Sequence, residues 1–110
     1  LVTKDETRFP EPKKNLFVAT AAQADGPFLQ VGKPFSPDWD EGPSLLKVED
    51  RWLIYFDEYS RKHYKAMQTK DFRTWREVET PLTYTAVMRQ GTTFPVKEEI
   101  ANRLLKFGTR

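Results

Sequence analysis

The stretch "DEGPSLLKVEDRWLIYFDE", residues 40–58, decides the fold. It contains two apolar runs, 44–48 and 51–58, separated by the acidic dipeptide Glu49-Asp50, which is a pattern typical of a β-hairpin. The five residues 52–56, Trp-Leu-Ile-Tyr-Phe, are apolar without alternation, so we expect both faces of this strand to be covered. Radially stacked sheets, as in the blades of a β-propeller, cover a strand in this way.

Further strands and one helix are predicted around this hairpin. The strand segments, rich in β-branched and aromatic residues, are 1–4, 15–21, 29–32, 63–70 and 75–79. Proline-rich stretches at 8–14 and 33–43 are predicted to be loops. Ile100, Leu104 and Phe107 recur at helical spacing before Gly108, which predicts a helix over 97–107. The chain is therefore predicted to be all-β with a short C-terminal helix.

A weak internal repeat supports a blade-like organisation. Residues 17–31 align with residues 64–78 at an offset of 47 residues, and 1–6 align with 53–58 at an offset of 52. A repeat in the forties with an aromatic residue near its end is typical of propeller blades. Two unrelated hairpins of similar length would give the same match, so this alternative stays open.

Composition limits the classes of function. The 110 residues include 18 basic and 16 acidic side chains, interspersed along the chain, and this balance gives no basic patch for nucleic acid. Without cysteine, the chain can form neither disulfides nor a thiolate metal site. No apolar run is long enough to span a membrane, and no signal peptide is recognisable. The cellular location stays open.

From Glu41 onward, the sequence resembles glycoside hydrolase family 43. The stretches that carry this resemblance are "DWDEGPSLLKVEDRWLIYFDEYS" (38–60), "HYKAMQTKDFRTWREV" (63–78) and "MRQGTTFPV" (88–96). Members of this family are five-bladed β-propellers that cleave arabinose- or xylose-containing glycans with inversion. The resemblance implies that residues 1–110 are the last two four-stranded blades of such a propeller, with the helix 97–107 at its end and the other blades upstream in a longer protein.

Glu41-Gly42-Pro43 resembles the general-acid motif of this family. Inverting hydrolysis requires one protonated carboxyl group at the leaving oxygen and one carboxylate base, roughly 6.5–9.5 Å away, that activates water. The Gly-Pro pair restricts the entry into the next strand, so we expect Glu41 to point into a concave, partly buried pocket at the inner end of its blade. The alternative is an ordinary surface glutamate in a turn.

Three more residues are candidates for binding the carbohydrate substrate. Arg89-Gln90-Gly91-Thr92 resembles an Arg-His-Gly-Thr motif in the last blade of the family, which implies that Arg89 contacts the sugar or the general acid. The family histidine faces the axis, often near a calcium ion. Gln90 replaces it here and cannot titrate, so the departure puts that central calcium in question. Trp39 is predicted either to stack on a sugar ring or to pack at the blade junction.

The remaining carboxylates and the histidine are interpreted as structural. We interpret Asp5 and Asp57 as turn residues and His63 as a solvent-facing loop residue. The base and a third, pKa-tuning aspartate are then expected outside the chain, so the isolated chain should be inactive. The alternative function is a non-catalytic propeller or β-domain that binds glycan or protein.

Partner contacts follow from the fragment interpretation. Two blades alone leave an apolar face bare at each end, and we expect these faces to carry Leu16, Val18 and the strand around Val96. The chain is therefore expected either to form a homo-oligomer or to pack on the remainder of the parent chain.

Overall fold

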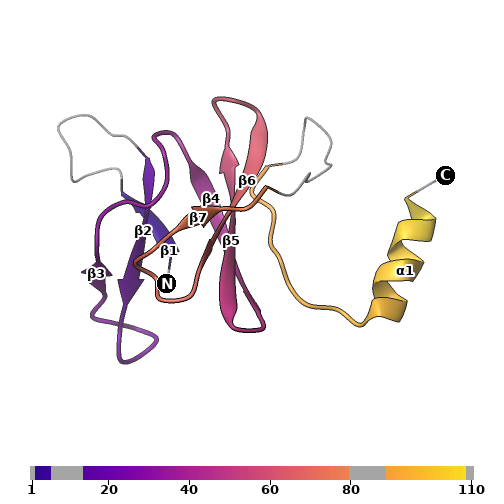
Figure 1. The fold of residues 1–110 in the computed structure, drawn as a ribbon, viewed down its shortest axis with the longest axis horizontal. Coiled ribbons are helices and arrows are strands. Elements are labelled where there is room, and N and C mark those ends of the chain that lie inside the picture. Colours follow the sequence, from indigo (N-terminus) through magenta and orange to yellow (C-terminus); the bar gives the residue numbers. More distant parts are fainter. Residues whose placement is uncertain (1, 6–13, 80–88, 109–110) are drawn as a thin grey trace.

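The structure is a computed structural model that describes residues 2–5, 14–79 and 89–108. These residues form two antiparallel sheets and a C-terminal helix (Figure 1). The first sheet has the order β1-β2-β3, with β1 Val2–Asp5, β2 Asn15–Thr20 and β3 Leu29–Val31. The second sheet has the order β4-β5-β6-β7, with β4 Glu41–Val48, β5 Arg51–Glu58, β6 His63–Thr69 and β7 Arg76–Glu77. The prediction of a mostly β chain with one helix is confirmed.

The two sheets are not equal in size within the described residues. The second sheet has four strands, as predicted, whereas the first has three. The aligned segments of the internal repeat do occupy strands in the same order, since β1, β2 and β3 correspond to β5, β6 and β7. Their pairing differs by one residue: Ala19 lies opposite Gln30, but Met67 rather than Ala66 lies opposite Glu77. The sequence repeat is therefore reflected in the order of the strands, but the residues that pair across the strands differ between the two sheets.

The hydrophobic core lies between the two sheets. Leu16 from β2 meets Ile54 and Phe56 from β5, and all three are fully buried. The half-buried side chains that pack around them are Phe35, Leu45, Trp52, Met67 and Trp75. The expectation that Leu16 and Val18 are exposed is wrong, because both side chains are buried and Leu16 packs against β5 of the second sheet. The loop that follows β3 also covers β2, with the amide of Phe35 donating to the carbonyl of Leu16.

The two faces of β5 are covered by different parts of the chain. Ile54 and Phe56 face the first sheet, whereas Tyr55 on the opposite face is only half-buried. Residues 89–93 lie on this opposite face. The amide of Thr93 donates to Ser44 Oγ at 2.7 Å, and the amide of Gly91 donates to the hydroxyl of Tyr64. The expected cover on both faces is therefore complete on one side and partial on the other.

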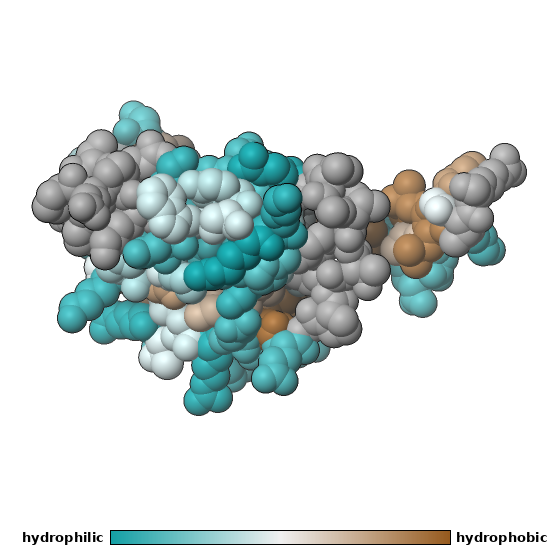
Figure 2. Space-filling view, turned by 90° about the horizontal axis from the view of Figure 1, so that it is seen from above, coloured by the Kyte–Doolittle hydropathy of each residue, from teal (hydrophilic) through white to brown (hydrophobic). Residues whose placement is uncertain are grey.

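Helix α1, Glu98–Phe107, has no buried residue. Acidic residues in its first turn and Lys106 in its last turn suit the helix dipole, and the chain leaves the helix at Gly108, as predicted. Its apolar side chains are uncovered, with Leu104 62% and Phe107 70% exposed, and Figure 2 shows the helix projecting away from the sheets. Val96 is exposed as well, as expected. In the described part of the chain, no helix is both long and apolar enough to cross a membrane.

Candidate functional site

Four buried carboxylates meet at one end of the second sheet. Asp40 and Glu41 lie where β4 begins, Asp57 and Glu58 lie where β5 ends, and Glu41 is the register partner of Asp57. Their exposed fractions range from 0% to 7%. Acidic side chains are seldom fully buried unless they are paired, so this concentration marks the candidate site. The interpretation of Asp57 as a turn residue is wrong, since strand pairing continues through Glu58, and Asp5 likewise lies within β1.

Glu41 and Asp57 share one guanidinium group. Arg89 Nη2 donates to Glu41 Oε1, and Arg89 Nε donates to Asp57 Oδ2 at 3.1 Å. Lys14 Nζ lies 3.9 Å from Glu41 Oε2, and the guanidinium group of Arg89 lies 5.3 Å from the ring centroid of Tyr59. The hydrogen bond to Asp57, together with the charges of both carboxylates, raises the pKa of Arg89. We call these five residues the Arg89 cluster: Glu41, Asp57, Arg89, Lys14 and Tyr59.

Gly42 allows the segment that carries Arg89 to approach β4. Its φ is +60°, and a Cβ atom at this position would lie 3.2 Å from Cγ and 3.3 Å from Cα of Gln90. The strand pairing shifts between Glu41 and Ser44, which places the Gly-Pro pair at a β-bulge inside β4. The expected boundary was wrong in this respect, because β4 begins at Glu41 rather than at Ser44. The bulge brings the first residues of β4 close to residues 89–93.

The structure brings together three of the four predicted site residues. Glu41 is buried, as expected, and contacts Arg89, while Gln90 lies beside Gly42. Trp39 is 43% exposed, and it lies two residues before Glu41 in the sequence. Its φ is +69°, a conformation that a bulky residue rarely adopts. Two hollows described in the molecule, of about 470 and 530 Å³, are lined by residues other than these four.

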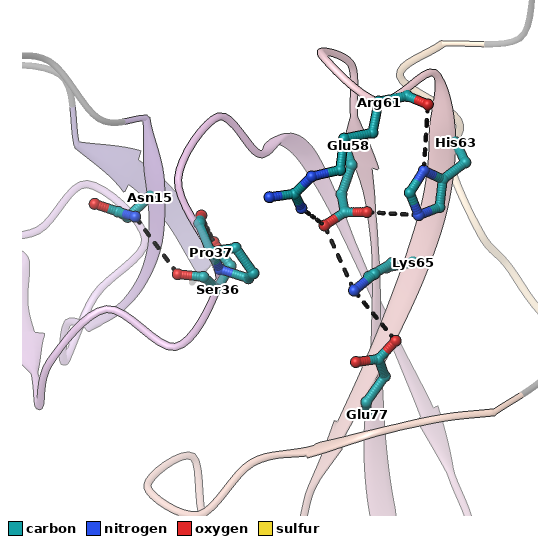
Figure 3. Close-up of polar contacts among 8 residues, drawn as sticks. All are labelled: Asn15, Ser36, Pro37, Glu58, Arg61, His63, Lys65 and Glu77. Atoms are coloured by element: carbon teal, nitrogen blue, oxygen red, sulfur yellow. Dashed lines mark hydrogen bonds and ion pairs between the residues drawn. The ribbon is translucent and has the colours of Figure 1, made fainter.

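A second cluster surrounds Glu58 on the opposite face of the sheet, toward the first sheet (Figure 3). Arg61 Nη1 donates to Glu58 Oε1 at 2.5 Å, His63 Nε2 lies 2.6 Å from Oε2, and Lys65 Nζ lies 3.6 Å from Oε1. Lys65 also pairs with Glu77 at 3.3 Å. The interpretation of His63 as a loop residue is wrong, because it begins β6, and its side chain, which is 43% exposed, also faces a buried carboxylate. We call Glu58, Arg61, His63, Lys65 and Glu77 the Glu58 cluster.

Asp40 is the most unusual group at this end of the sheet. It is fully buried, and neither carboxylate oxygen has a hydrogen-bond partner among the described residues. Burial, and then the charge of Glu58, raise the pKa of Asp40 to about 7, although Ser36, Arg61 and Lys65 lie near enough to oppose the shift. Asp40 can therefore carry a proton near neutral pH. The only signal of this group in the sequence is the acidic pair Asp40-Glu41 at the start of the hairpin.

The described residues do not fit the calcium ion that the family resemblance implies. No group of three or more histidine or acidic side chains among them is arranged to hold a metal ion. The carboxylates of Glu41 and Asp57 already face two cations, Arg89 and Lys14, which would repel a divalent cation. The amide of Gln90 adds no charge to offset this repulsion.

Comparison with known proteins adds no family or function to what these residues indicate. No family model matches the chain, and neither does any curated protein or solved structure with which it was compared.

Proposed function

We propose that the chain is part of a propeller glycoside hydrolase of the family 43 type, which cleaves arabinose- or xylose-containing glycans with inversion. The observation that carries this proposal is the contact between Glu41 and Arg89, which lie 48 positions apart. The motifs around these two residues resemble separate parts of the family pattern, and the fold brings them into one cluster. Two meandering sheets packed over a shared core support the further proposal that they are neighbouring blades.

In this proposal, Glu41 is the general acid and Arg89 controls its proton. A general acid must be protonated before it acts, whereas an ion pair with Arg89 requires the ionised carboxylate. Arg89 must therefore release Glu41 when the substrate binds. Its side chain is 54% exposed and already bonded to Asp57, so it can keep one partner while it leaves the other. Asp40, with a pKa raised to about 7, is a nearby group that is partly protonated at neutral pH.

Asp57 does not serve as the base. Glu41 and Asp57 bind the same guanidinium group, so they are neighbours rather than carboxylates that face each other across a sugar ring. The base that activates water is therefore expected outside the 110 residues. It follows that the isolated chain should not hydrolyse glycosides.

The ion pair itself favours a second candidate function. A glutamate held by Arg89 and Lys14 is suited to binding rather than to proton donation. In a non-catalytic propeller or β-domain, Arg89 and the two carboxylates would hydrogen-bond to sugar hydroxyls or to a protein partner. Arg89 remains accessible for such contacts.

Incubating the full-length gene product with aryl arabinofuranosides and xylosides tests the proposal. We expect hydrolysis, with proton NMR showing that the sugar released first has the inverted anomeric configuration. Retention of configuration would contradict the proposed mechanism. Binding of arabino- or xylo-oligosaccharides without hydrolysis would overturn the enzyme assignment and support the non-catalytic alternative.

A further inference from the structure

A groove between the two sheets is separate from the buried carboxylates. Its volume is about 530 Å³, within the range of pockets that hold small ligands. One wall is formed by the end of β3 and the residues after it, including Gln30 and Lys33. The other wall is formed by the turn before β7, including Phe72, Arg73 and Trp75. The charged residues that line this groove, Lys33 and Arg73, are both cationic.

The turn that carries Phe72 and Arg73 is held by its own side chains. Thr69 Oγ1 accepts from the amide of Phe72 at 2.9 Å. Asp71 Oδ1 accepts from the amides of Arg73 and Thr74 at 2.9 and 2.8 Å, and these bonds lower the pKa of Asp71 to about 2. The turn therefore presents its side chains in a fixed arrangement.

Trp75 fixes the other end of this turn. Its ring stacks on Phe35, with the ring centroids 3.8 Å apart. Thr69, Asp71 and Trp75 each take part in building the turn. Phe72 and Arg73 lie between them and line the groove, with Phe72 in a left-handed conformation at φ +58°.

The opposite wall supplies a hydrogen-bonding amide and a second cation. Gln30 Nε2 donates to the carbonyl of Gly32 at 2.8 Å, so the amide is held in place with its oxygen available as an acceptor. Lys33 is exposed at the groove. Two cations without a lining carboxylate favour an anionic ligand, and Arg73 can bind a carboxylate through two parallel hydrogen bonds.

We propose that this groove binds a carboxylate-bearing sugar, namely a uronic acid unit of a glycan. Lys33 and Arg73 bind the carboxylate, Gln30 accepts a hydrogen bond from a hydroxyl group, and Phe72 and Trp75 contact the apolar C–H groups of the ring. This inference rests on the proposed function for the glycan as ligand. It goes further by naming an acidic substituent and a binding site apart from Glu41.

Titration calorimetry with the full-length protein tests this site. The probes are a xylo-oligosaccharide that carries one glucuronic acid, its methyl ester, and acetate. We expect the acid to bind at least about tenfold more tightly than the ester, with a preference that weakens as salt is added. Equal affinity for acid and ester, or full competition by millimolar acetate, would overturn the proposal.

A matched pair of double variants assigns the site to the groove. Lys33→Ala/Arg73→Ala should weaken binding of the acidic oligosaccharide by about tenfold or more. Lys62→Ala/Arg103→Ala removes the same charge from exposed positions elsewhere and should leave binding unchanged. Equal losses of affinity in both double variants would show that binding depends only on net charge, and would contradict a specific binding site in the groove.

Glu41→Gln distinguishes this inference from the proposed function. This variant should lose hydrolysis in the full-length protein and keep binding of the acidic oligosaccharide in the groove. If the wild-type protein fails to hydrolyse glycosides but binds the acidic probe, the enzyme proposal falls and the groove proposal stands. If hydrolysis is found but the acidic and neutral probes bind equally, only the groove proposal falls.

Discussion

The two faces of the second sheet bury carboxylates at the same end but balance their charges differently. On one face Glu41 and Asp57 share the exposed Arg89, whereas on the other face Glu58 is surrounded by several cations. Asp40 is fully buried, and neither of its carboxylate oxygens has a hydrogen-bond partner in the described part of the chain. Because successive strand residues point to opposite faces, two acidic doublets supply both clusters. The difference separates a site with an exposed cation, Arg89, from a buried one in which Asp40 can carry a proton near neutral pH.

The largest loss of stability is expected when the Glu58 cluster loses its central carboxylate. Glu58→Ala should lower the free energy of unfolding by about 2–3 kcal/mol, because it leaves Arg61, His63 and Lys65 close together without their shared carboxylate. Urea denaturation measures this change. Glu49→Ala, at an exposed turn, is the control and should stay within about 0.5 kcal/mol of the wild type. Equal effects of the two substitutions would mean that the Glu58 cluster contributes no more than a surface charge.

Asp40 should give stability a distinct pH dependence. Its pKa is raised from 3.8 to about 7 in the folded state, so the folded protein binds this proton more tightly than the unfolded chain does. Its contribution to stability is therefore full below pH 4 and is lost as the pH rises to about 7. Asp40→Asn removes this dependence and should be about 3 kcal/mol more stable than the wild type above pH 7, relative to their difference at pH 4.

Denaturant titrations of both proteins between pH 4 and 8 test this prediction. The difference between the two proteins isolates Asp40, because every other side chain is the same in both. A difference that stays constant over this range would show that Asp40 does not retain its proton in the folded state.

The smallest effect concerns the approach of Arg89 to β4. Gly42→Ala should cost about 1–2 kcal/mol from its left-handed backbone, plus a smaller cost from contact with Gln90. Gly32→Ala is the matched control, because its φ is +75° and no atom lies within 4 Å of the added Cβ position. Thermal denaturation should therefore show a larger loss for Gly42→Ala. A loss no larger than in the control would mean that residues 89–93 do not depend on close contact with β4.

Local sequence patterns predicted the strands and the helix because these elements depend on neighbouring residues. The hairpin of β4 and β5 follows from its apolar runs and its turn dipeptide, and the helix from its spacing and Gly108. The motifs also pointed to Glu41 and Arg89, although their contact depends on the fold. Propeller closure and the missing upstream blades stay predictions.

Burial could not be predicted in the same way. Asp57 and His63 sit in polar sequence next to a hairpin turn, so local rules made them turn and loop residues. Strand pairing with Glu41 and contact with Glu58 come from residues farther along the chain. Leu16 was expected on the bare end face of a two-blade piece. It is covered instead by β5 and Phe35, which are distant in the sequence and which the pattern around Leu16 does not reveal.

The leaving-group dependence of Glu41→Gln tests the central claim most directly. General-acid assistance matters for a poor leaving group and little for a good one, so a variant without the acid should discriminate between them. In the full-length protein, we predict that Glu41→Gln lowers kcat/KM for an unactivated xylo- or arabino-oligosaccharide by about 100-fold or more, and for the dinitrophenyl glycoside by less than about tenfold. Equal losses on both substrates, or no loss on either, would contradict the assignment of Glu41 as the general acid.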